Sequence, residues 1–409
     1  MGEFPVTSRI ALPAFDVIER ALRATTGRLA GEIANPSAQP PAWDEFEWGV
    51  ARAVCAMHGL AALLANRLKW QGPSSWSSFL IEQRDHSRAH YERAGEILAR
   101  IDAAARDAGI RCIALKGSAL RALALHQPGE RPMGDIDLLV APRDLPACAS
   151  MLSKIGYEPA FSSRRHEVFA PIERHEPHAY AEHALNPLKI EVHTRIAECL
   201  PATAVDITSG LRPKDMRPGI NPYASRVELL RHILLHTAGN MRAHALRFIQ
   251  PYDIATLGRL LTAEEWRELR EPAANAWWIY PPLSLAERCM PGSIPPDVLE
   301  SFRALCPRRL RAHVQKSGLY EVSWSNLRIA ALPGSEWART PLELLRFAKS
   351  RLLPSRAALQ ELAQAVAVFP AYSRQRWYGA SHFERILRWI FSRPPRVQTM
   401  ISVRAALGQ

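Results

Sequence analysis

The stretch from residue 110 to residue 140 constrains the fold most, because its apolar pattern departs from the helical period that dominates the rest of the chain. IRCIALKG (110–117) predicts a short buried strand that ends at a glycine, and DIDLLV (135–140) predicts a second strand. SALRALAL (118–125), between them, predicts a helix, and LKIEVHTRI (188–196) predicts a later strand. Because such strands need covering layers, we expect a small α/β unit enclosed by helices on both sides.

Helical periodicity surrounds this unit. Apolar residues recur at helical spacing over residues 43–70, a long helix is predicted at about 82–108, and the pattern is helical again from Ser225 onward. Residues 142–156 predict a helix that begins near a proline and ends before a glycine. Two further strand-like runs lie at 166–170 and 178–182.

These patterns predict an α+β fold in which a small mixed-sheet core is flanked by N-terminal and C-terminal helical regions. The chain has 409 residues, 47% of them hydrophobic, which is enough to bury a sizeable core. The expected regions are an N-terminal helical region (1–85), an α/β core (86–200), a helical region (201–300) and a basic helical region (301–409).

The excess positive charge lies at the end of the sequence. The net charge is +12, from 52 Lys and Arg against 40 Asp and Glu, and residues 301–409 hold 18 basic and 5 acidic residues. From Arg374 to Arg396, arginines alternate with Trp, Tyr and Phe. Such a segment could contact nucleic acid, an anionic membrane surface or an acidic partner. The favoured arrangement instead packs its aromatic side chains on the body of the protein and leaves its arginines in water.

Cysteine usage and hydropathy favour a cytoplasmic protein. The six cysteines are scattered, with no CxxC pair and no zinc-ligand spacing, as is typical of proteins from a reducing compartment. No apolar run approaches the ~20 residues that a transmembrane helix needs.

Two aspartates on the second strand are the strongest candidates for chemistry. Side chains at positions i and i+2 of a strand point to the same face, so Asp135 and Asp137 lie together while Ile136 and Leu138 face the core. Two carboxylates ~4 Å apart repel by about 4 kcal/mol at an effective dielectric constant of about 20. The pair must therefore be protonated, paired with basic groups or bridged by a cation, and hard oxygen ligands select Mg²⁺ or Mn²⁺. The alternative is a solvated pair at the edge of a strand.

The preceding turn and the later strand supply the other candidates. Gly117 lets the backbone pass close to a ligand, and the helix after it offers free N–H groups to phosphate. Ser118 adds a hydroxyl group and Lys116 a positive charge, although Lys116 could instead neutralise the aspartates. Glu191 is the candidate for a third metal-binding carboxylate; the alternative is a surface glutamate paired with Arg195.

This order of glycine–serine turn, helix, DxD strand and later strand carboxylate resembles the DNA polymerase β-like nucleotidyltransferase superfamily. ALKGSAL, RPMGDIDLLV, IEVHTRI, ELLRHILLHTAGN and RFIQPYDIATL are similar, more narrowly, to an uncharacterised bacterial nucleotidyltransferase family with an LKGxxL…DIDLLV signature. The resemblance covers most of the chain. It implies a nucleotidyltransferase core, an NTP substrate and a Mg²⁺ or Mn²⁺ cofactor.

The resemblance also implies roles for single residues. Asp135 and Asp137 match the metal-binding pair of the superfamily. The family usually has aspartate at the position of Glu191, so the third carboxylate is one methylene group further from the backbone here. The residues implied for nucleotide binding are Lys116, Gly117, Ser118 and Arg131. Arg131 could instead be an ordinary loop arginine.

Three other polar positions are weaker candidates. His193 follows Glu191 on the same strand face. We expect it to orient that glutamate or to make a core contact, and not to act as a base, because a metal ion can itself lower the pKa of the attacking hydroxyl group. His232 and His236 share a helix face but lack a third ligand, so a core or surface role is favoured. Asp253 is expected to form an ion pair with the sheet unit, with a substrate role as the weaker alternative.

The sequence therefore predicts nucleotidyl transfer from an NTP, with ATP favoured, to a hydroxyl group of a small-molecule, sugar or peptide acceptor. The same ligands would permit phosphoryl transfer through attack at the γ-phosphate. Glu191 in place of aspartate favours another alternative, a catalytically weak nucleotide-binding or regulatory protein. An RNA-modifying transferase that uses the basic tail is a third alternative.

Overall fold

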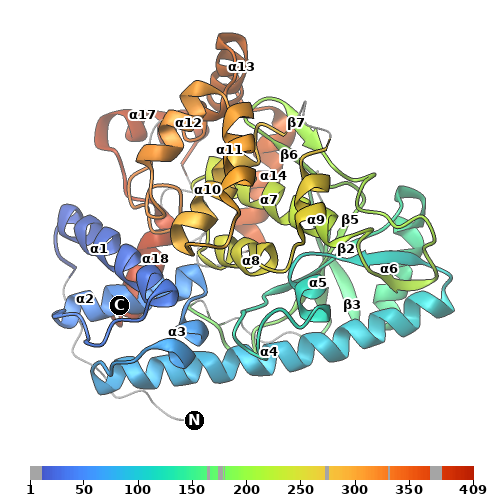
Figure 1. The fold of residues 1–409 in the computed structure, drawn as a ribbon, viewed down its shortest axis with the longest axis horizontal. Coiled ribbons are helices and arrows are strands. Elements are labelled where there is room, and N and C mark those ends of the chain that lie inside the picture. The colour runs from blue at the N-terminus through green and yellow to red at the C-terminus, as the bar shows by residue number, and fades with distance from the viewer. Residues whose placement is uncertain are drawn as a thin grey trace.

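A six-stranded mixed sheet with helices on both of its faces forms the α/β part of the molecule (Figure 1). The computed structural model describes residues 12–163, 166–173, 178, 180–271, 276–329, 332–368 and 380–409. The strand order is β3-β4-β5-β2-β1-β8. The strands of this sheet are β1 (Arg111–Ala114), β2 (Asp135–Leu139), β3 (Tyr157–Ser162), β4 (His166–Pro171), β5 (Lys189–His193) and β8 (Gly219–Asn221). The predicted α+β class and mixed sheet are confirmed.

The pairing around β2 determines which side chains meet. β2 runs parallel to β5 and antiparallel to β1, and β1 runs parallel to β8. Asp137 lies opposite Glu191 in the β2–β5 register. β4 runs antiparallel to β5, with His166 opposite His193. Three neighbouring strands therefore bring these four side chains to one region of the sheet.

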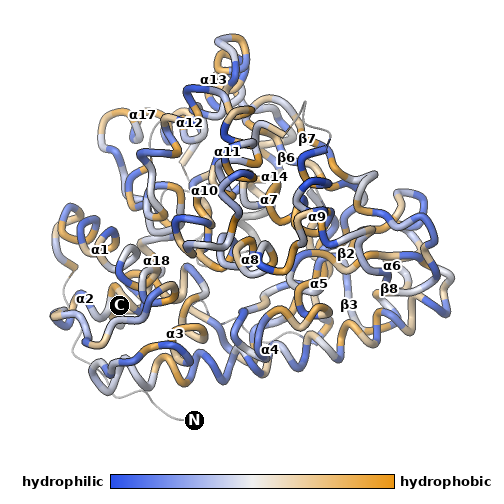
Figure 2. Tube along the Cα trace, in the orientation of Figure 1, coloured by the Kyte–Doolittle hydropathy of each residue, from blue (hydrophilic) through white to orange (hydrophobic). Residues whose placement is uncertain are grey.

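The two faces of the sheet have different surroundings. Ile136, Leu138, Ile190 and Val192 belong to a compact core with α4 (Ser74–Asp107) and α6 (Leu145–Lys154) on one face. Figure 2 shows apolar and polar residues alternating along α4, as expected of a helix with one face on a core. Leu139, on the opposite face, joins the larger core formed by the helical part of the chain. Alternation therefore turns Asp135 and Asp137 toward that helical part.

Helices on both sides of the strand segment make up the rest of the fold. Those before and within it are α1 (Phe15–Ala34), α2 (Glu45–His58), α3 (Ala61–Arg67) and α5 (Gly117–Ala122), with a 3₁₀ turn η1 (Pro142–Asp144) before α6. Those after it are α7 (Arg226–Arg242), α8 (Ile249–Gly258), α9 (Ala263–Leu269), α10 (Tyr280–Cys289), α11 (Pro296–Leu305), α12 (Arg308–Lys316), α13 (Pro341–Leu352), α14 (Arg356–Val368), α17 (His382–Ser392) and α18 (Val397–Ala406), with η3 (Ser335–Trp337) before α13. A two-stranded sheet pairs β6 (Ala197–Cys199) with β7 (Ala204–Asp206).

Local signals explain where several helices begin and end. Asp44 caps α2 and forms a capping box with Glu47, and Gly59 ends the helix in the left-handed region with φ of 67°. Ser225 caps α7 by accepting a hydrogen bond from the backbone N–H of Glu228. α18, at the end of the chain, packs against α2 near its beginning.

The prediction of a strand at 178–182 is wrong: residues 178 and 180–182, the ones that the structure describes there, do not lie in a strand. The side chain of Gln83 in α4 accepts a hydrogen bond from the backbone N–H of Glu182 at 2.8 Å and donates to its carbonyl oxygen at 3.0 Å. The N–H and carbonyl groups of Glu182 thus bond to a side chain and not to a neighbouring strand.

The expected packing of the tail aromatics is wrong for Phe383 and Phe391, whereas Trp389 is partly buried. In α17, Phe383 is 68% exposed and Phe391 is 83% exposed. The predicted segment from Arg374 to Arg396 includes residues 374–379, which lie outside the described residues.

No single helix in the described ranges has both the length and the apolar composition of a membrane span. α2 and α3 reach that composition only when counted together, across a bend of 112°.

Candidate active site

Most of the predicted carboxylate and histidine side chains lie on one polar face of the sheet, formed by β2, β5 and β4. Residues two apart in a strand share a face, so β2 presents Asp135 and Asp137 while β5 presents Glu191 and His193. The register places Asp137 beside Glu191. The structure thus brings together four side chains that the sequence singled out.

Asp137 is held as a buried, ionised carboxylate. Its side chain is 4% exposed, and its Oδ1 lies 2.8 Å from Nζ of Lys116 and 2.9 Å from Nε2 of His193. Burial alone would raise its pKa, but the charge of Lys116 and the hydrogen bond from His193 hold the pKa of Asp137 well below its usual value. Although burial opposes it, the charge of Asp137 also raises the pKa of Lys116 to about 12. Lys116 therefore neutralises Asp137, which is the alternative to phosphate binding that the sequence offered for this lysine.

Asp135 has the opposite electrostatic environment. It is an exposed residue at the start of β2. Partial desolvation, followed by the negative charges of Asp137 and Glu191, raises the pKa of Asp135 to about 7. The repulsion expected within the pair is therefore relieved in two ways, by ion pairing at Asp137 and by protonation at Asp135.

Lys116 occupies a strained turn between β1 and α5. Its φ is 47° and its ψ is −117°, which is unfavourable for a residue with a side chain. The backbone N–H of Lys116 donates to the hydroxyl oxygen of Tyr223 at 3.1 Å, and that hydroxyl group is 2.7 Å from Nδ1 of His232. Tyr223 was not predicted, because no local pattern links it to a turn 107 residues earlier. His232 is buried, as expected of a core histidine.

Arg131 lies against the same turn and is held by Asp253. Its guanidinium group is 2.9–3.0 Å from both carboxylate oxygens of Asp253. His126, which the sequence did not single out, contacts Asp253 at 2.9 Å. A Cβ atom added at Gly117 would lie 2.6 Å from Nη1 of Arg131, so a larger residue here would displace this guanidinium group.

Ser118 and Glu191 have distinct surroundings. Ser118 is buried, its N–H donates to the carbonyl oxygen of Leu115, and its hydroxyl group has no partner among the described residues. Glu191 does not pair with Arg195, which instead forms an ion pair with Asp206. The alternative reading of Glu191 as a surface partner of Arg195 is therefore wrong.

The family model described as "Uncharacterised nucleotidyltransferase" matches residues 44–289, more than half of the chain. The chain belongs to this nucleotidyltransferase family. Membership makes the protein a transferase of nucleotidyl groups that takes an NTP as substrate. The matched range runs from the cap of α2 to the end of α10 and includes all eight described strands. No curated protein and no solved structure matches the chain.

The candidate ligands of this nucleotidyltransferase are of the chemical type that binds a hard divalent cation. Asp135, Asp137 and Glu191 offer carboxylate oxygens, the ligands that Mg²⁺ and Mn²⁺ prefer. Within the described residues, however, the three-membered set whose ligand atoms all lie within 4.8 Å of one another is His166, Glu191 and His193. His166 was missed because its neighbour across the sheet, His193, is 27 residues away in sequence.

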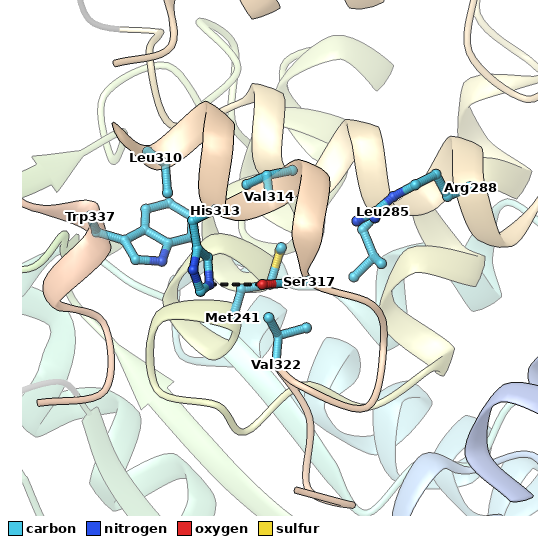
Figure 3. A pocket seen from close by; sticks show the side chains of 9 residues that line it. All are labelled: Met241, Leu285, Arg288, Leu310, His313, Val314, Ser317, Val322 and Trp337. Carbon is cyan, nitrogen blue, oxygen red and sulfur yellow. Dashed lines mark hydrogen bonds between the residues drawn. The ribbon is translucent and has the colours of Figure 1, made fainter. Parts of the chain in front are cut away.

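A small cavity elsewhere in the nucleotidyltransferase does not suit a nucleotide. It lies between α7, α10 and α12, with a hydrogen bond of 3.0 Å between His313 and Ser317 on its wall (Figure 3). Its volume is about 10 Å³, which is comparable to the space for a single water molecule. This cavity therefore does not compete with the polar face of β2, β5 and β4 as a nucleotide site.

Proposed function

We propose that this nucleotidyltransferase moves a nucleotidyl group from an NTP, with ATP favoured, to a hydroxyl group of a small-molecule, sugar or peptide acceptor. The proposed reaction depends on Mg²⁺ or Mn²⁺ held by Asp135, Asp137 and Glu191. The observation that supports this best is the pairing of β2 with β5, which sets Asp137 beside Glu191 on the face that also presents Asp135.

Each carboxylate has a separate part in the proposal. A divalent cation bound there would neutralise charge on the triphosphate and lower the pKa of the attacking hydroxyl group. Asp135 is the exposed member, and a cation favours its ionised form. Asp137 is already ionised, because Lys116 and His193 both contact its Oδ1.

Lys116 and Arg131 are the proposed phosphate-binding charges, beside the turn at Gly117 and Ser118. The Lys116 ammonium group is bound only to Asp137 among the ion pairs of the described residues. When a cation neutralises Asp137, this ammonium group can contact a phosphate oxygen instead. Arg131 is fixed in place by Asp253, so its remaining N–H groups need little reorganisation to bind phosphate.

A catalytically weak nucleotide-binding protein is the second candidate. The spacing of the three carboxylates favours it, since their oxygens do not all approach within 4.8 Å in the described structure. A nucleotide and its cation would then have to draw the carboxylates together before any reaction.

Labelled ATP separates the candidates. The full-length protein is incubated with Mg²⁺, a pool of sugar, peptide and small-molecule acceptors, and ATP labelled at either the α- or the γ-phosphate. Transfer of the α-label supports nucleotidyl transfer, and transfer of the γ-label alone supports phosphoryl transfer. ATP binding without transfer of either label supports the second candidate.

Matched variants test the residue assignment in the same assay. Asp135→Asn should lower transfer by at least ~100-fold, because it removes a carboxylate that holds the divalent cation in the proposed reaction. Asp107→Asn, an exposed aspartate at the end of α4, should leave transfer within about twofold of wild type. Unchanged transfer by Asp135→Asn contradicts the assignment.

A further inference from the structure

His166, Glu191 and His193 form a compact group of mixed nitrogen and oxygen ligands. Oε2 of Glu191 lies 3.7 Å from Nε2 of His166 and 3.7 Å from Nε2 of His193. All three ligand atoms lie within 4.8 Å of one another. Bonds of about 2.0–2.1 Å to a tetrahedral zinc ion place neighbouring ligand atoms ~3.4 Å apart. The two distances to Glu191 are thus within ~0.3 Å of this spacing, and the two histidine nitrogens lie within 4.8 Å of each other.

The sheet fixes this spacing. His166 on β4 lies opposite His193 on β5, and the two rings are tilted by 52° with centroids 5.0 Å apart. Glu191 is two residues before His193, so it shares the same face. Ligands on neighbouring strands of one sheet are better fixed than ligands on loops.

His166 has no evident structural role of its own. Its Nδ1 is buried with no hydrogen-bond partner among the described residues, and its Nε2 is beyond hydrogen-bond distance of Glu191. A satisfied structural histidine would show hydrogen bonds from its ring.

We propose that His166, Glu191 and His193 bind a divalent transition-metal ion of the zinc type. This goes beyond the proposed function, because imidazole nitrogen selects zinc, cobalt or nickel over Mg²⁺. Glu191 is common to both sites, and Nε2 of His193 also contacts Asp137 at 2.9 Å. Binding of the ion replaces this contact, since Nε2 carries either the proton that it donates to the carboxylate or the lone pair that binds the metal.

The test uses zinc alone, without nucleotide. Full-length protein freed of metal by a chelator is titrated with Zn²⁺ by calorimetry in excess Mg²⁺, and Co²⁺ binding is followed by its visible absorption. Wild type should bind one Zn²⁺ and give the intense visible bands of four-coordinate Co²⁺. His166→Ala should weaken Zn²⁺ binding by at least ~30-fold and remove these bands.

Two controls separate this proposal from the proposed function. His313→Ala, in the helical region, should keep the zinc affinity of wild type. Asp135→Asn should still bind one Zn²⁺, whatever happens to nucleotidyl transfer, because Asp135 is not among the three proposed ligands. Equal zinc affinity in His166→Ala and wild type, or no zinc binding by wild type in excess Mg²⁺, overturns the proposal. Because the ring of His166 makes no hydrogen bond with the described residues, its replacement should leave folding intact, and circular dichroism checks this.

Discussion

Asp135 and Asp137 are two residues apart, yet their neighbours give them different protonation behaviour. Lys116 and His193 both contact Asp137, whereas Asp135 faces the negative charges of Asp137 and Glu191. Carboxylate pairs whose surroundings separate their pKa values are typical of sites with distinct roles for each group. Asp137 is thus a fixed negative charge, whereas the protonation of Asp135 should respond to any cation bound nearby.

Stability measurements should separate the two aspartates. Asp137→Asn leaves Lys116 and His193 without their buried partner and should lower the free energy of unfolding by ~3 kcal/mol. Asp135→Asn removes a repelled carboxylate and should leave stability unchanged or raise it by up to about 1 kcal/mol, since solvent screens this exposed group. Urea unfolding at pH 7 without metal ions measures both values. Equal losses in the two variants would show that the aspartates are equivalent.

Among single residues, local spacing was enough to find Asp135, Asp137 and Glu191, because residues two apart on a strand share a face whatever the strand pairs with. It could not find His166 or Tyr223. These act through contacts across the sheet and across 107 residues of sequence, respectively, and a single sequence contains no signal for such contacts.

At the level of elements, the turn from β1 to α5 has a strained backbone that is stabilised by a hydrogen bond from another part of the chain. Lys116 adopts φ of 47°, and Tyr223 accepts the hydrogen bond from its N–H. Such strain persists only where the surroundings hold it, and it is common at functional sites. The helical part of the chain, which contributes His232 from α7, therefore helps to shape the turn.

Tyr223→Phe should weaken that support. The partly buried N–H of Lys116 would lose its acceptor, so the free energy of unfolding should fall by about 1–3 kcal/mol. Thermal or urea unfolding measures this, and nucleotide affinity should fall as the turn relaxes. Tyr91→Phe is the matched control, because its ring keeps its contact with the guanidinium group of Arg121 and stability should change by less than ~0.5 kcal/mol. Equal effects of the two variants would contradict the role of Tyr223.

Helices and strands were predicted best where the hydrophobic periodicity is strong and no contact with another part of the chain decides the local structure. The strands expected at 110–117 and 135–140 contain β1 and β2, and the run at 188–196 contains β5. The run at 178–182 has a strand-like composition, but Gln83 of α4 takes its backbone hydrogen bonds. Tertiary contacts of this kind override local propensity, and no local pattern reveals them.

For the whole molecule, two buried histidines connect stability to pH. His58 is fully buried, with Nε2 2.7 Å from Oγ of Ser325 and Nδ1 accepting from the N–H of Phe248 at 3.0 Å. Burial, with a smaller effect of Arg247, lowers the pKa of His58 to about 3. Burial, with a smaller effect of Lys116, lowers the pKa of His232 to about 3 as well.

These shifts predict that acid destabilises the fold. In the unfolded chain both histidines take up protons below about pH 6.5, whereas in the folded protein they remain neutral until about pH 3. The stability they contribute is therefore complete above pH 6.5 and is lost as the pH falls toward 3. Each contributes a slope of up to ~1.4 kcal/mol per pH unit. Urea unfolding from pH 7 to pH 5 should show a smaller slope in His58→Gln, and an unchanged slope would contradict a neutral His58.

The most direct test of the proposed active site is to locate Mn²⁺ and a non-hydrolysable NTP analogue in crystals of the full-length protein. Anomalous scattering should place Mn²⁺ between the carboxylates of Asp135, Asp137 and Glu191, with the triphosphate against Lys116 and Arg131. A triphosphate bound on another face, or Mn²⁺ with no ligand from β2, would contradict the account.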